Sequence, residues 1–217
     1  MSIELQLKLM LWVIKAVMIV IVFYSIILHE ISHAVVAKWL GDDTAKRQGR
    51  LSLNPFKHID IFGTVILPLL TYFTLGFIWG YAKPVPINPY NFKNPKRDMG
   101  LSAAAGPLSN ILIGIVFAML FHLSTGSYIV SQICWNVIYL NFLLAFFNLI
   151  PVPPLDGSKV LGMFMTDEAY LKWTYQERKG MMILFIIIVA SNIMGLNIIG
   201  RVVIPPVRFM MRLLGVM

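Results

Sequence analysis

The chain has 217 residues, of which 58% are hydrophobic and only 13% are charged. An average soluble domain is about 25% charged, so this composition argues against a soluble globular protein and favours a membrane protein. The net charge of +8 does not indicate nucleic-acid binding, because the basic residues lie in short loops between long apolar segments. The only cysteine, Cys134, excludes an intrachain disulfide and a metal site of several thiolates.

The first apolar segment, residues 16–37, is long enough to cross a membrane and contains His29-Glu30-Ile31-Ser32-His33. A helix places the two histidines one turn apart on the same face, where both imidazoles can reach one zinc ion. Glu30 is then the candidate general base of a metallopeptidase. Ionisable residues at membrane depth are costly and indicate function. The alternative is a pair of histidines that only pack between helices.

The next apolar segment, Ile61–Ala82, lies between two basic stretches. Residues 38–57 contain five Lys or Arg and residues 83–97 contain four. Basic loops favour the cytoplasmic side, and a single crossing would separate these two stretches. We therefore predict a re-entrant hairpin, in which Pro68 helps to break the helix, and the alternative is a plain membrane span. The motif then lies toward the cytoplasmic end of its helix.

Two short stretches predict a small β element near the cytoplasmic face. Residues 49–54 alternate polar and apolar side chains, as an edge strand does. Residues 83–88 contain prolines that block one set of ladder hydrogen bonds. We expect one of these stretches to pair with an unwound substrate, or else only to cap the cavity.

Two more uncharged segments, residues 101–127 and 128–155, predict helices that run outward and back. The second segment ends in three prolines within four residues, which unwind the chain just before Asp156. Irregular backbone at membrane depth is tolerated where it lines a cavity, so Asp156 is the candidate third metal ligand. Its alternative role is to cap a helix that begins near Ser158. Other candidates are disfavoured because they lie in the basic loop or at the outer end of a helix: His58, Asp60 and His122.

The last part of the chain predicts one more crossing at residues 180–200 and an interfacial amphipathic helix in the arginine-containing tail that follows. The expected fold is an all-α polytopic membrane protein with about five to six membrane-embedded helices or hairpins. We expect residues 1–217 to form a single membrane-embedded domain. Its core is residues 16–162, and residues 180–217 supply the C-terminal helix and tail.

The motif at residues 29–33, together with Phe147-Asn148-Leu149-Ile150-Pro151-Val152-Pro153-Pro154-Leu155-Asp156-Gly157, closely resembles the site-2 protease family of intramembrane zinc metalloproteases. Residues 49–55, 83–89 and 105–110 look like the compact prokaryotic branch of that family, without PDZ or CBS domains. The resemblance covers roughly residues 23–162.

This resemblance implies a Zn²⁺ ion held by His29, His33 and Asp156, with Glu30 as the catalytic glutamate. Asn148 matches an asparagine for which a substrate-binding or oxyanion role is proposed, and its alternative is a helix–helix hydrogen bond. The implied activity is hydrolysis of peptide bonds within or near the transmembrane segments of single-span or other membrane-protein substrates. The implied location is the cell membrane, with the active site toward the cytoplasm.

Two other functions remain open at this point. A zinc-binding membrane transporter would use the same three ligands as a transit site, because broken helices and buried polar residues also occur in transporters. An inactive scaffold relative of the proteases is the second. Glu30 separates these classes, because a transit site has no need of a general base.

Overall fold

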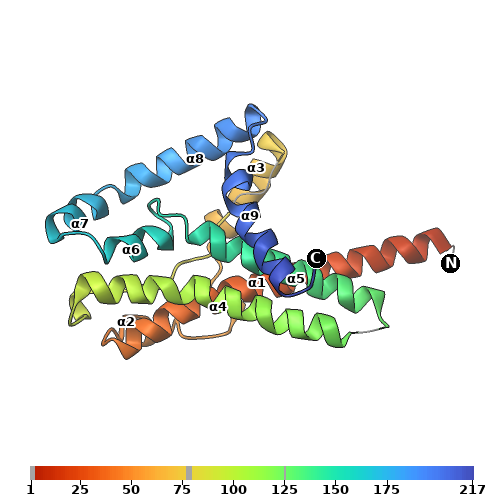
Figure 1. The fold of residues 1–217 in the computed structure, drawn as a ribbon, viewed down its shortest axis with the longest axis horizontal. Coiled ribbons are helices and arrows are strands. Elements are labelled where there is room, and N and C mark those ends of the chain that lie inside the picture. Colours follow the sequence, from red (N-terminus) through yellow and green to blue (C-terminus); the bar gives the residue numbers. More distant parts are fainter. Residues whose placement is uncertain (1–2, 77–79, 125) are drawn as a thin grey trace.

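The structure, a computed structural model that describes residues 3–76, 80–124 and 126–217, is helical with irregular connections throughout this part of the chain (Figure 1). Its longest helices are α1 (Ile3–Trp39), α4 (Pro95–Leu123) and α5 (Tyr128–Asn148). Helix α4 is central, since it packs against α1, α5 and the short helix α6 (Asp156–Gly162). The site is built where these helices meet.

The main apolar core lies between α4, α5 and the C-terminal helix α9 (Ile198–Leu213). Helices α4 and α5 approach closely at Gly114, where a β-carbon would lie 2.5 Å from the ring of Phe142. Helix α9 is amphipathic, as predicted for the tail. Part of its apolar face packs against α5 through fully buried residues such as Val207, while Val202, Phe209 and Leu213 are exposed, so its position at a membrane interface stays a prediction.

Residues 61–82 fold back on themselves. The π-helix η2 (Ile61–Ile66) continues into α3 (Leu67–Leu75), while residues 77–79 of this segment lie outside the described residues. On the return, the Tyr81 N–H donates to the Gly63 carbonyl at 3.0 Å, and the Lys83 N–H donates to the His58 carbonyl at 2.9 Å. The two ends are therefore adjacent, which confirms the hairpin and excludes a straight crossing. The depth of the hairpin in a bilayer stays a prediction.

The expected number of membrane-embedded elements is confirmed only in part. Within the described residues, α1, α4 and α5 are long and apolar enough to cross a membrane. A fourth crossing is present only if α8 (Glu177–Ile193) and α9 count as one broken span, because they are bent by 93°. The single helix expected at 180–200 is interrupted because Asn197 is left-handed (φ 46°) and the Ser191 hydroxyl accepts the Ile198 N–H at 2.8 Å.

The predicted β element is wrong for the described part of the chain, which contains no strand. Side chains bind several of the backbone groups that a strand at residues 83–88 would offer to a partner. The Arg50 guanidinium donates to the carbonyls of Lys83 and Pro84, and Glu30 accepts the Val85 N–H. Residues 49–54 are likewise not extended, because the Ser52 N–H turns back to the Arg50 carbonyl.

A buried carboxylate, Asp42, joins the end of α1 to the loop before α4. It is 1% exposed and accepts the backbone N–H of Asn88 at 2.8 Å and the side-chain amide of Asn91 at 2.7 Å. Thr44 donates to it through both its backbone and its hydroxyl. Burial alone would raise the pKa of Asp42, but these hydrogen bonds outweigh it and hold the pKa below its ordinary value.

We expect Asp42→Asn to lower the stability of the protein at neutral pH by about 1.5–3 kcal/mol, the usual contribution of a hydrogen bond to a charged group. Because the folded-state pKa is depressed, the stabilisation by Asp42 is complete above the ordinary pKa and is lost as the pH falls through the folded-state value. Apparent melting temperatures of both proteins in detergent between pH 3 and 7 measure this. The difference between them should shrink at low pH, and a constant difference would contradict the prediction.

Candidate metal centre

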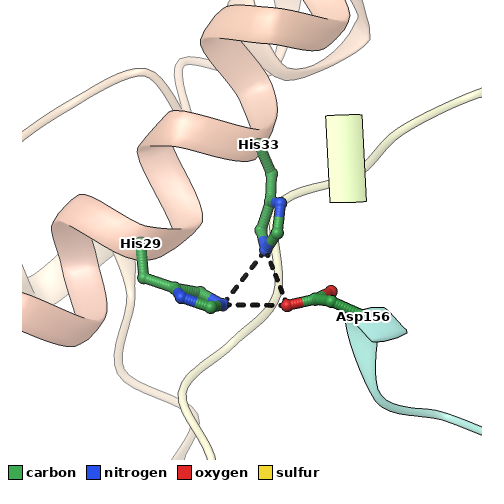
Figure 2. Close-up of side chains that lie close together, drawn as sticks. All are labelled: His29, His33 and Asp156. Carbon is green, nitrogen blue, oxygen red and sulfur yellow. Dashed lines mark hydrogen bonds and ion pairs between the residues drawn. The ribbon is translucent and has the colours of Figure 1, made fainter. Parts of the chain in front are cut away.

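Three predicted ligands come together between α1 and α6 (Figure 2). His29 and His33 lie one turn apart on α1, and their Nε2 atoms are 3.1 Å from each other. Oδ2 of Asp156 is 3.2 Å from Nε2 of His29 and 3.3 Å from Nε2 of His33. All three residues are at least nine-tenths buried. The chain thus places three ligand atoms in one small triangle, although they are 127 residues apart at most.

The size of this triangle fits a zinc ion. Zinc forms bonds of about 2.0–2.1 Å to nitrogen and oxygen, so neighbouring ligand atoms of a tetrahedral site lie about 3.3–3.4 Å apart. The three edges measured here are 3.1–3.3 Å. Three protein ligands leave a fourth position open, which is the arrangement of a catalytic site and not of a closed structural one.

The outer nitrogens of both histidines are hydrogen-bonded, which directs the inner ones to the triangle. Nδ1 of His33 lies 2.8 Å from the backbone carbonyl of Ser102 on α4. A carbonyl only accepts, so Nδ1 carries a proton, and in the neutral ring this leaves the lone pair of Nε2 for a metal. Nδ1 of His29 lies 2.6 Å from the side-chain oxygen of Asn110, also on α4.

Asp156 owes its position to the unwound end of α5. Helix α5 stops at Asn148, and α6 begins at Asp156 after the proline-rich turn. A β-carbon at Gly157 would lie 2.2 Å from the Leu149 carbonyl oxygen, so only glycine allows the two helix ends to approach this closely. The alternative role of Asp156 as a helix cap is wrong, because Leu155 occupies the cap position and no side chain caps this helix.

The charge of Asp156 also suits a ligand. Burial would raise the pKa of its carboxyl group, but hydrogen bonding and attraction to His29 and His33, when these imidazoles are protonated, hold the pKa well below its ordinary value. The group is therefore a carboxylate at neutral pH, which is the form that binds a metal.

Glu30 lies on α1 between the two histidines and is half-buried. Its Oε2 accepts the backbone N–H of Val85 at 2.9 Å, so the loop between the hairpin and α4 orients the carboxylate. A carboxylate fixed by one oxygen still has acceptor sites for a proton on the other. This is the state that a general base requires.

The other predicted residues lie elsewhere or make local contacts. The Asn148 amide donates to the Leu144 carbonyl of its own helix at 3.0 Å, which is neither a contact with the triangle nor a helix–helix hydrogen bond. Its substrate or oxyanion role stays a prediction. The disfavoured ligand candidates all have other partners in the structure: His58 contacts Ser52, Asp60 caps η2, and His122 contacts Leu214.

Comparison with known proteins assigns the family. The sequence profile of peptidase family M50 matches residues 124–191. A protein of Bacillus subtilis (strain 168) named "Putative zinc metalloprotease YwhC" is 37% identical over 184 residues, covering 79% of this chain and 80% of that protein. The chain belongs to peptidase family M50. Membership in M50 confirms the resemblance to site-2 proteases found in the sequence.

In more distant relatives of this M50 peptidase, the matched region is a smaller share of the relative's length. "Zinc metalloprotease MJ0392" of Methanocaldococcus jannaschii is 28% identical over 188 residues, which are 85% of this chain and 45% of that protein. "Putative zinc metalloprotease Rip2" of Mycolicibacterium smegmatis is 26% identical over 169 residues, or 76% and 63% of the two chains. No solved structure matches the chain significantly.

Sequence reasoning missed the residues of this M50 peptidase that surround the ligands. Asn110 and Ser102 contact the histidines from α4, and Gly106 between them lies directly against both imidazoles. Asn141 on α5 contacts Asn110 in turn. The available signal was the position of Asn110 and Asn141 within the long uncharged segments 101–127 and 128–155, because buried amides in apolar segments need partners.

Proposed function

We propose that this M50 peptidase is an intramembrane zinc endopeptidase of the site-2 type, which hydrolyses peptide bonds within or near the transmembrane segments of membrane proteins. One observation carries the proposal. His29, Glu30 and His33 lie on α1, which is long and apolar enough to span a membrane, and the ligand triangle is buried among helices. A site in this position is suited to substrates that reach it from within the bilayer.

Each residue of the site has a role in this proposal. The three ligands hold zinc, which when bound polarises the scissile carbonyl and activates water near neutral pH. Glu30 takes the proton of the attacking water and returns it to the leaving amine. The Val85 N–H holds Glu30 in place for both transfers. A helical substrate must unwind first, because its peptide groups are otherwise hydrogen-bonded within the helix.

The proposed location is the cell membrane, with the site toward the cytoplasm. Three stretches of the chain that contain four or five Lys or Arg, residues 38–57, 83–97 and 159–179, are joined by side-chain contacts. Arg50 binds the Lys83 carbonyl, and Lys96 forms an ion pair with Asp167 at 2.6 Å. The turn between α4 and α5 contains no Lys or Arg. This distribution supports the orientation through the positive-inside rule.

Co-expression with a panel of tagged single-span membrane proteins tests the proposal. The wild-type protein should convert at least one of them to a shortened product. Glu30→Gln should bind as much zinc as the wild type and cleave about 10²–10⁴-fold more slowly, because it lacks the general base. Glu4→Gln, a substitution at the exposed other end of the same helix, is the matched control and should cleave normally.

The same proteins separate the alternative functions. Equal cleavage by the wild type and Glu30→Gln would contradict the proposed mechanism. Zinc transport into vesicles that Glu30→Gln leaves unchanged would support a carrier. Zinc binding without cleavage or transport would support an inactive relative.

A further inference from the structure

A chain of buried polar side chains runs from His29 through three helices. The side-chain oxygen of Asn110 on α4 is hydrogen-bonded to Nδ1 of His29. The side-chain amide of Asn110 donates to the side-chain oxygen of Asn141 on α5 at 2.9 Å. Asn141 donates its own amide to the Val137 carbonyl at 2.9 Å and to the Ser25 hydroxyl on α1 at 3.1 Å. Both asparagines are 0% exposed and Ser25 is 2% exposed. The chain therefore begins and ends on α1.

The contact between Asn141 and the Val137 carbonyl determines which group donates in each hydrogen bond of this series of polar side chains. The Val137 carbonyl only accepts, so the amide nitrogen of Asn141 must face it. The oxygen of Asn141 then faces Asn110, which must present its own nitrogen to that oxygen. The oxygen of Asn110 consequently faces His29, whose Nδ1 must carry the proton. In the neutral ring, the lone pair of Nε2 is then left to face the metal triangle.

The two histidines differ in how firmly their surroundings fix the tautomer with the proton on Nδ1. His33 contacts a backbone carbonyl, which cannot become a donor. His29 contacts a side-chain amide, which becomes a donor if it rotates by half a turn. A reversed Asn110 would donate to Nδ1 of His29 and move the proton to Nε2, where it competes with the metal. His29 thus needs a second residue that prevents the reversal.

We propose that Asn141 is this positioning residue: by accepting from Asn110, it fixes the tautomer of His29 and thereby sets the zinc affinity of the site. The inference rests on the proposed function for the identity of the metal. Asn141 lies on another helix and makes its contact through Asn110, so it acts without touching zinc or substrate.

A double-mutant cycle that combines Asn141→Leu with Asn110→Asp tests the proposal. An aspartate at position 110 has no N–H group, so its rotation cannot present a donor to His29. Asn141→Leu should lower zinc affinity about 10–100-fold, the usual effect of losing an outer partner of a metal ligand. In the Asn110→Asp background, where reversal cannot create a donor, Asn141→Leu should change zinc affinity much less. Chelator competition measures both. Equal losses in the two backgrounds would show that Asn141 acts through packing alone and would overturn the proposal.

A second measurement reads the tautomer directly. In Asp156→Ala protein without zinc, which lacks the carboxylate 3.2 Å from Nε2 of His29 that would attract a proton there, the ¹⁵N chemical shifts of the His29 imidazole should show the proton on Nδ1, and adding Asn141→Leu should move part of the population to Nε2. Unchanged shifts would contradict the proposal. Asn136→Leu is the matched control, since Asn136 lies on the same helix and its side-chain amide donates to the Gln132 carbonyl of that helix. Neither readout requires proteolysis, so a failure of the proposed activity remains distinguishable from a failure of this inference.

Discussion

An Asp156→Ala variant is expected to lose high-affinity zinc and, with it, all proteolysis. The carboxylate contributes one of three ligand atoms, 3.2 and 3.3 Å from the two histidine nitrogens. Two imidazoles alone hold zinc weakly, and the loss should exceed the about 10–100-fold that removal of an outer partner causes. Zinc content after dialysis and chelator competition measure this loss, and cleavage of a tagged substrate measures the activity.

The matched control for this prediction is Asp167→Ala. Asp167 is also the first residue of a short helix, α7 (Asp167–Thr174), but its side chain is 91% exposed and pairs with Lys96. This variant should keep its zinc. Wild-type zinc affinity in Asp156→Ala would show that Asp156 is not a zinc ligand and that another residue supplies the third ligand atom.

Gly106→Ala should disable the site although Gly106 is not a ligand. A β-carbon at this position would lie 2.4 Å from Cε1 and Nε2 of His33 and 2.6 Å from Cε1 of His29. Both imidazoles must therefore move, and the fold resists this because their Nδ1 atoms are held by α4 itself. We expect a loss of zinc affinity at least as large as that from Asn141→Leu and a corresponding loss of cleavage.

Gly114→Ala separates this effect from general overpacking. It makes the same change on the same helix, but its β-carbon meets the ring of Phe142 in the core instead of the site. Overpacking a core costs about 1–3 kcal/mol, so this variant should lower the melting temperature while zinc affinity is retained. Gly106→Ala protein with wild-type zinc affinity would show that the histidines have more freedom than their contacts indicate.

The sequence predicted the ligands for reasons that are local. The i and i+4 spacing of His29 and His33 determines that they share a face of any helix, whatever packs against it. The prolines before Asp156 determine that α5 must end there. The same reasoning predicted the hairpin, because the basic stretches on both sides of residues 61–82 require a common side.

The incorrect predictions concerned interactions between distant segments. Residues 83–88 were predicted to be part of a β element, but Arg50 and Glu30 bind backbone groups that a strand there would use. The tail is amphipathic, as predicted, but its pattern did not show that its buried residues pack on α5. An apolar pattern shows that a face must be covered and does not identify the partner that covers it.

The sequence by itself thus determined the membrane class, the two histidines with their glutamate, and the break that precedes Asp156, since each depends on contiguous residues. The tertiary structure decided the rest. It closed the ligand triangle, placed Gly106 against the imidazoles and linked His29 to Asn110 and Asn141, residues 81 and 112 positions away in the chain. Such contacts depend on the packing of whole helices, because the direction of a buried hydrogen bond is set by its partner and not by its neighbours in the sequence.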